Sequence, residues 1–448
     1  MVRLEAGVAE LDITPPLNIS LAGSFTSRPA HDVHDPLRAK ALVIDDGTVR
    51  VAMVVLDLIG ITLADVQTVR ELVQEATGIP PGHVLIGCTH THTGPAMFRV
   101  GEVHPDPDYV RWVVRRIADS VVLAVRRLRP ARMAWGRGEV HGISFCRRYR
   151  MRNGYVQMNP GRGNPDIIGP TSPIDPEVGV LLVETPEGQP ISVVAQFSLH
   201  YVGTDDGRAV SADYYGHFDR FMRQMLGAQC IPMLFNGTSG QINNVNVFDP
   251  HQQAGHKQAK RVASILGGEV LKVLSRISPQ TDVSIRAASQ QVTLPRKKYT
   301  EEDLSIAKAI LDGKDPDPQG GPFSWVVGQP IPAALRPMYA QESLLLAELP
   351  AQISSEVQVI RIGESAWVGL PGEIFTEIGL AIKESSPCPH TFVIGLANDC
   401  LAYIPTDKAL KEEGGYETWA AAWNPVGEGA EGILVGTAKV LLDKLCAR

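Results

Sequence analysis

Two histidines two residues apart, His90 and His92, stand in the stretch 87–95 (GCTHTHTGP). They follow the short apolar run 83–86, which predicts a buried strand. Side chains alternate along a strand, so residues two apart at its end point to the same side. Imidazole is the commonest protein ligand for zinc. The pair therefore predicts a metal site at a strand-to-loop junction, with the neighbouring threonines orienting the ring nitrogens. A polar loop without metal is the alternative.

Two more side chains could complete such a site. His200 ends the apolar, β-branched run 191–199 and precedes a glycine-containing loop, as the first pair does. A lone histidine there could be a core residue, but as a third imidazole it is better interpreted as a ligand. Glu373 lies between a hairpin and a helix, where it could support the helix N-terminus or supply an oxygen ligand.

Three further features bear on the chemistry. Asp57 ends the apolar run 51–57, and a carboxylate there is costly unless it is paired or holds a ligand histidine. The loop 236–244 offers backbone N–H groups to a ligand, but it is not a G-x-S-x-G nucleophile elbow. Cys88 beside His90 allows a cysteine nucleophile, although zinc ligation better explains His200 and Glu373.

The elements that must position these residues alternate between strand and helix patterns. Strands are expected at 39–45, 51–57, 132–140, 178–183, 191–199, 231–235, 282–294, 357–362, 366–370 and 391–396, and helices at 63–76, 107–128, 213–226, 257–277, 374–383 and 430–445. Without a sequence repeat or clear linker, residues 1–448 are expected to form one α/β domain. The segment 147–176 is predicted to be a functional loop, and 312–337 a lid, a subunit contact or a disordered insert.

The amino-acid composition and net charge limit the classes of partner that the chain is expected to bind. The 448 residues are 44% hydrophobic and 20% charged, as in soluble globular proteins, and the net charge of -7 argues against nucleic acid or an anionic membrane as the main partner. No apolar run approaches the roughly 20 residues of a membrane span, and the N-terminus has no signal-peptide pattern. Six scattered cysteines without a C-x-x-C pair predict reduced thiols. A cytoplasmic enzyme is therefore expected, and a homo-oligomer is one alternative for its assembly.

Several short motifs, taken in order, resemble the neutral/alkaline (non-lysosomal) ceramidase family. They are AELDITPP (9–16), THTHTGP (89–95), the loop around Arg147, FSLH (197–200), LPGE (370–373), GLANDCLAYIPT (395–406) and Gly415-Tyr416-Glu417. The resemblance implies a single catalytic domain with mixed β-sheets flanked by helices, from a relative without the family's C-terminal β-sandwich domain.

The resemblance also implies roles for individual residues. One zinc ion would be held by His90, His200, Glu373 and Tyr403. His92 would line the site without binding metal, whereas spacing alone would have made both members of the pair ligands. The active-site arginine would be Arg147, with Arg148 as the alternative and a candidate substrate contact. Gly23 would lie in a substrate-contacting turn, and Asn243 stands where the family has an active-site serine.

These assignments predict zinc-dependent hydrolysis of an amide in a small or lipid-like substrate. Zinc lowers the pKa of a bound water to roughly 7. Arg147, with Tyr403 or Asn243, would stabilise the developing oxyanion, and His92 would donate a proton to the leaving amine. An esterase or lactonase using the same zinc, and a metal-binding or ligand-binding protein without catalysis, are the alternatives.

Overall fold

Three mixed β-sheets form the frame of the chain, and four strands of each sheet have the same topology. The computed structural model describes residues 4–316 and 323–446. In each sheet the first strand pairs antiparallel with the second and the second with the third, and a helix then leads from the third strand to a parallel fourth. The chain thus contains a threefold structural repeat that is not visible in its sequence.

The strands and crossover helices of the three units are as follows. The first unit contains β1 (Glu5–Asp12), β3 (Arg38–Asp45), β4 (Arg50–Leu56), α1 (Leu63–Thr77) and β5 (Val84–Cys88). The second contains β7 (Arg132–Glu139), β12 (Glu177–Glu184), β13 (Pro190–Phe197), α3 (Asp213–Leu226) and β15 (Ile231–Asn236). The third contains β17 (Ile285–Pro295), β18 (Gln352–Ile362), β19 (Ser365–Gly369), α7 (Thr376–Ser385) and β21 (His390–Ile394).

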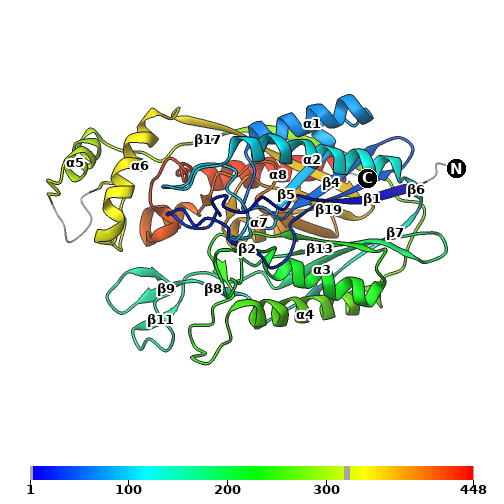
Figure 1. Cartoon of the computed structure of the whole chain (residues 1–448), viewed down its shortest axis with the longest axis horizontal. Coiled ribbons are helices and arrows are strands. Elements are labelled where there is room, and N and C mark those ends of the chain that lie inside the picture. Colours follow the sequence, from blue (N-terminus) through cyan, green and yellow to red (C-terminus); the bar gives the residue numbers. More distant parts are fainter. Residues whose placement is uncertain (1–3, 317–322, 447–448) are drawn as a thin grey trace.

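A second helix closes each unit and packs beside its crossover helix: α2 (Pro107–Arg126), α4 (Gly255–Leu274) and α8 (Ala430–Cys446). The helix pairs cover the outer faces of the sheets, with α1 and α2 on one side of the molecule and α3 and α4 on the opposite side (Figure 1). The inner faces share one core, to which Met53, Phe235 and Trp367 each come from a different sheet. Because both faces of these strands are buried, they read as apolar runs rather than alternating patterns.

Further short strands lie outside the four strands that the sheets have in common. They are β2 (Asp32–Val33), β6 (Arg129–Pro130), β8 (Phe145–Cys146), β14 (Ala209–Val210), β16 (Ile242–Asn243), β20 (Glu373–Ile374) and β22 (Tyr403–Ile404). One glycine shows how tightly the frame is packed: a Cβ added to Gly179 of β12 would lie 2.3 Å from the ring of Phe392 on β21. Glycine at this position permits the second and third sheets to approach each other.

The α/β class with mixed sheets and flanking helices is confirmed, and the expected elements are present with small shifts at their ends. Two helices were not predicted, α5 (Glu301–Leu311) and α6 (Arg336–Glu348). The segment 147–176 is not a plain loop, because β9 (Arg148–Met151), β10 (Val156–Met158) and β11 (Ile167–Pro170) form a small sheet within it. These strands are too short, and too interrupted by glycine and proline, for the pattern to indicate them.

The segment 312–337 is packed where it is described; its residues 317–322 lie outside the described ranges. Phe323 stacks on Trp325, and Trp325 in turn lies beside Tyr339 of α6. The described part of this segment thus packs against α6, and its interpretation as a lid, a subunit contact or a disordered insert stays a prediction. Across the described ranges, no helix combines the length and apolarity needed to cross a bilayer.

The expectation that all cysteines are reduced is wrong for one pair. Cys388, after α7, and Cys446, at the end of α8, form a disulfide, while Cys88, Cys146, Cys230 and Cys400 are free thiols. The two partners are 58 residues apart, so only the packing of α8 beside α7 brings them together. Disulfides persist mainly in oxidising compartments, and the cytoplasmic location stays a prediction.

We expect the double variant Cys388→Ser/Cys446→Ser to unfold more easily, because the bond restricts the unfolded chain. Disulfides contribute about 2–4 kcal/mol. Chemical denaturation of the variant and of the Cys230→Ser control, which removes a free thiol, measures the difference. Equal unfolding free energies of the wild type and the double variant would contradict the expectation.

Candidate active site

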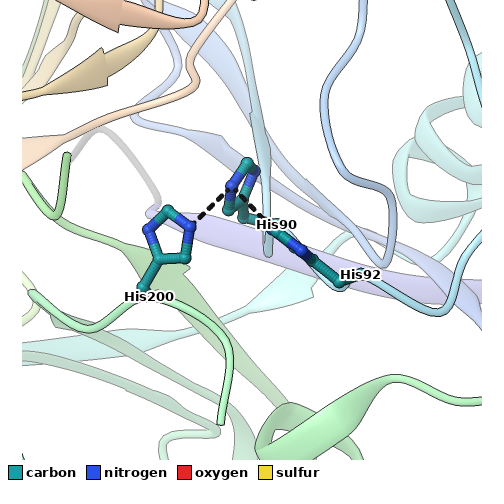
Figure 2. A group of neighbouring side chains, drawn as sticks. All are labelled: His90, His92 and His200. Atoms are coloured by element: carbon teal, nitrogen blue, oxygen red, sulfur yellow. Dashed lines mark hydrogen bonds between the residues drawn. The ribbon is translucent and has the colours of Figure 1, made fainter. Parts of the chain in front are cut away.

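Three imidazoles converge where the first and second sheets end. The Nε2 atom of His90 lies 3.2 Å from Nε2 of His92 and 3.2 Å from Nε2 of His200 (Figure 2). The ligand atoms of the three rings all lie within 4.8 Å of one another, and His90 and His200 are buried. This is the spacing of groups that share one metal ion, since zinc–nitrogen bonds are about 2.0–2.1 Å long.

The backbone brings the pair His90 and His92 together in a different way from that predicted. Strand β5 ends at Cys88, and His90 has a φ of +67°, in the left-handed region that non-glycine residues seldom occupy. The two rings therefore converge through a turn and not through strand alternation. His200 follows the end of β13 by three residues.

Backbone carbonyls fix the tautomers of the rings. Nδ1 of His90 bonds the Ile59 carbonyl at 2.7 Å, and Nδ1 of His200 bonds the Ser239 carbonyl at 3.2 Å. Because a carbonyl only accepts, each Nδ1 carries the proton and each Nε2 presents a lone pair. Two lone pairs facing each other at 3.2 Å require a cation or a proton between them, so the cluster fits a metal ion.

The threonines play another part than predicted. Both Thr91 and Thr93 donate their hydroxyl hydrogen bonds to the Ser211 carbonyl, at 2.6 and 3.0 Å, and thereby tie the histidine loop to the start of α3. Orientation of the rings comes instead from backbone carbonyls, a common arrangement around metal-binding histidines.

The third unit supplies a carboxylate and a phenol. Strands β20 and β22 pair in parallel with Glu373 opposite Tyr403. Oε2 of Glu373 lies 3.3 Å from Nε2 of His90 and 3.7 Å from Nε2 of His200. This oxygen is buried and has no hydrogen-bond partner among the described residues. An orphaned carboxylate oxygen beside two imidazole lone pairs again fits a shared divalent ion.

Arg147 directly follows β8, and its side chain reaches the same point. Its Nη1 lies 3.5 Å from Nε2 of His200, and its guanidinium group lies over the Tyr403 ring, 5.2 Å from the centroid. Its Nε donates to Glu417 at 2.8 Å, whereas its buried Nη2 finds no partner in the described part of the chain. Arg147 thus brings an unused donor to the site.

Arg148 does not face the site. Its side chain is 1% exposed and donates to Glu417 at 2.9 Å and to Glu413 at 3.4 Å. Within the described ranges it lines neither of the cavities at the site, so the structure gives no support to Arg148 as a substrate contact. Burial would raise the pKa of Glu417, but the guanidinium groups of Arg147 and Arg148 hold it below its ordinary value.

We expect Glu417→Gln to destabilise the protein strongly, because it leaves two buried guanidinium groups without their shared anion. Removing one partner of a buried ion pair costs about 3–5 kcal/mol. Glu428→Gln is the matched control, since Glu428 pairs with Lys411 at the exposed surface, where a pair contributes little. Denaturant unfolding of both variants makes the comparison, and similar losses in the two would refute this role of Glu417.

Gly23 and Asn243 lie at the site. Gly23 has a φ of +81°, and a Cβ there would lie 2.4 Å from Cβ of His92. Its backbone also hydrogen-bonds the ring of His92. Asn243 donates its amide to Oδ1 of Asn159 at 2.9 Å and lines the wall of one cavity.

Asp57 does not hold a ligand histidine, so that prediction is wrong. Its carboxylate accepts from the backbone N–H of Arg38 at 2.9 Å and lines a separate cavity with Lys40 and Asp219. Burial raises the pKa of Asp57 to about 7. The backbone carbonyl of Ile59, two residues later, occupies the place beside His90 that the carboxylate was expected to take.

Two cavities open beside the imidazoles, with volumes of about 230 and 410 Å³, and they share Gly23, Phe25, His92, Tyr403 and Tyr416. Sequence reasoning missed two aromatic residues here. Tyr201 stacks on His92 with 3.7 Å between centroids, and its only signal was its place next to His200. Tyr416 lies in the motif Gly415-Tyr416-Glu417, for which the sequence predicted no role.

Cys88 is fully buried in the core, which raises the pKa of its thiol and leaves the cysteine-nucleophile alternative without support.

Residues 4–233 match the family described as "Neutral/alkaline non-lysosomal ceramidase, N-terminal". The chain belongs to this family. The neutral ceramidase of Pseudomonas aeruginosa is 24% identical in an alignment 399 residues long, and the match covers 76% of this chain and 57% of that protein. The chain therefore spans little more than half the length of this relative of the ceramidase family.

Solved structures show the same fold. The crystal structure of neutral ceramidase from Pseudomonas aeruginosa aligns with a TM-score of 0.70 and 18% identity, covering 100% of this chain and 74% of that one. A structure described as ceramidase complexed with C2 aligns with a TM-score of 0.69 and 17% identity, covering 100% and 75%. The ceramidase fold thus accommodates the whole chain.

Proposed function

We propose that this chain is a zinc-dependent hydrolase that cleaves an amide bond of an N-acyl substrate. The observation that carries the proposal is the convergence of three imidazole Nε2 atoms and the orphaned Glu373 carboxylate oxygen at the meeting point of three sheets. Membership of the ceramidase family supports amide hydrolysis as the reaction class.

In this proposal His90, His200, Glu373 and Tyr403 hold the ion. Imidazole nitrogen and carboxylate or phenol oxygen donors suit zinc, the ion expected from the resemblance. When bound, zinc supplies a Lewis acid that polarises the scissile carbonyl and lowers the pKa of water.

His92 is the group placed to move protons. Burial, followed by the neighbouring His90 and the guanidinium groups of Arg28 and Arg147, lowers the pKa of its imidazole, which favours the neutral ring. Its Nε2 can take a proton from the attacking water and deliver it to the leaving amine. The Gly23 backbone and the stacked Tyr201 ring hold it in place for this transfer.

Arg147 is the group placed to stabilise negative charge. Its unpartnered Nη2 is buried, where a hydrogen bond to a developing oxyanion contributes more than it would in water. The ion pair with Glu417 keeps the guanidinium group oriented without using that donor. The amide of Asn243 stands on the same wall as a further candidate donor.

Metal removal tests the proposal. We expect about one zinc ion per chain by elemental analysis, loss of hydrolysis on a panel of N-acyl compounds from short amides to ceramide after chelation, and recovery when zinc is returned. Matched esters on the same panel measure the preference for amides. Full activity of the chelated protein would refute the mechanism, and zinc without turnover of any acyl compound would favour a binding protein.

A further inference from the structure

The two cavities at the site differ in chemistry. The smaller one, here called the apolar chamber, is walled by Ile59, Ala96, Phe98, Val100, Val103 and Trp423. The larger one, here called the amide chamber, carries Arg147, Asn159, Tyr201, Asn243, Asn244 and Gln329. Because His92 and Tyr403 line both, a substrate bond held at these residues would extend one half into each chamber.

The apolar chamber suits a hydrocarbon group. Ala22, Ala96 and Val103 form a small buried cluster with Ile59 on its wall, and the short side chains leave the space open. Phe25 and Trp423 add an aromatic wall, with their ring centroids 5.6 Å apart. Most of its polar groups belong to the active site itself, so apolar contact is the main interaction available to a ligand away from the imidazoles.

The amide chamber suits a polar group. The buried Nη2 of Arg147 has no partner there among the described residues. The three asparagines are held in fixed orientations: Asn243 donates to Asn159 at 2.9 Å, and Asn244 donates to the Val202 carbonyl at 3.0 Å. A hydrocarbon placed in this chamber would leave the buried Nη2 donor of Arg147 unsatisfied, at a cost of about 1–3 kcal/mol.

We propose that the substrates are N-acyl derivatives of a small polar amine. The acyl hydrocarbon occupies the apolar chamber, and the amine portion, carrying hydroxyl or carboxylate oxygens as hydrogen-bond acceptors, occupies the amide chamber. This inference rests on the proposed function and adds its substrate class. The two chambers meet at His92, so the scissile amide lies at their junction, where the proton is transferred.

Matched substrates test the inference on the zinc-loaded protein. One octanoyl group is joined to serine, to ethanolamine or to hexylamine, and the serine and ethanolamine compounds distinguish a carboxylate from a hydroxyl. We expect kcat/KM at least tenfold higher for one of the polar amines than for hexylamine. Equal or faster hydrolysis of the hexylamine compound would overturn the inference and leave the proposed function standing.

Two variants test which chamber holds the acyl group and which holds the amine portion of the substrate. Ala96→Phe fills the apolar chamber and should raise KM for octanoyl substrates tenfold or more while changing acetyl substrates less than threefold; Ala228→Phe, at an exposed position, is its control. Asn244→Leu should reduce the preference for polar amines, with the exposed Asn153→Leu as control. Equal effects of Ala96→Phe on both acyl lengths would contradict the placement of the acyl group.

Binding to the chelated protein separates this inference from catalysis. Calorimetry measures the Kd of octanoyl-serine, octanoyl-ethanolamine and octanoyl-hexylamine without turnover. We expect tighter binding of a polar compound, and at least tenfold weaker binding of it to Ala96→Phe. If no compound is hydrolysed but this order holds, the proposed function fails and the inference stands as a binding specificity; the reverse order overturns it.

Discussion

His90→Ala is expected to lose zinc and hydrolytic activity together. Nε2 of His90 is the centre of the cluster, 3.2 Å from the Nε2 atoms of His92 and His200 and 3.3 Å from Oε2 of Glu373. Without this ring, the ligand atoms of His92, His200 and Glu373 lose the nitrogen atom that lies between them. A metal ion contributes several kcal/mol to transition-state stabilisation, so the loss in kcat/KM should be on the order of 10³-fold or more.

Elemental analysis and kinetics on the same sample check this result. His104→Ala is the matched control, because His104 is exposed and lies outside the cluster. The ring of His90 also bonds the Ile59 carbonyl, so thermal unfolding must show that the variant folds. A folded variant that keeps one zinc ion would place the ion elsewhere and end the proposed mechanism.

His92→Ala is expected to keep zinc and lose turnover. In the proposed function this ring moves protons and does not bind metal, and a positioned acid or base contributes roughly 10²–10⁴-fold. The fall should appear in kcat, because the proton moves in the transition state. Zinc content per chain should equal that of the wild type.

The zinc content of His92→Ala distinguishes two roles of this ring, metal ligand and proton-transfer group. The Nε2 atoms of His92 and His200 lie equally close to Nε2 of His90, so three imidazoles could share the ion. If zinc is lost from His92→Ala, all three are ligands and the role implied by the family resemblance is wrong. Partial recovery of turnover with added imidazole, at unchanged zinc content, would support proton transfer by this ring.

Local pattern alone predicted much of the frame. The apolar periodicity of 213–226 gave the bounds of α3 as observed, and Gly78 ends α1 in the left-handed conformation expected of a helix-terminating glycine. Histidines placed directly after apolar runs predicted that His90, His92 and His200 share one site, because strand ends meet at one edge of a fold. Such features depend on neighbours along the chain.

Long-range packing decided what the sequence could not show. The Ile59 carbonyl stands where Asp57 was expected, Cys388 bonds Cys446, and Glu417 pairs with arginines about 270 positions earlier. The threefold repeat of sheets likewise has no sequence signal, since many apolar sequences fill the same topology. Spacing along the chain therefore determined which residues could form a metal site, whereas the partner of each polar atom was determined only by the packing of three sheets, from separate parts of the chain, on one core.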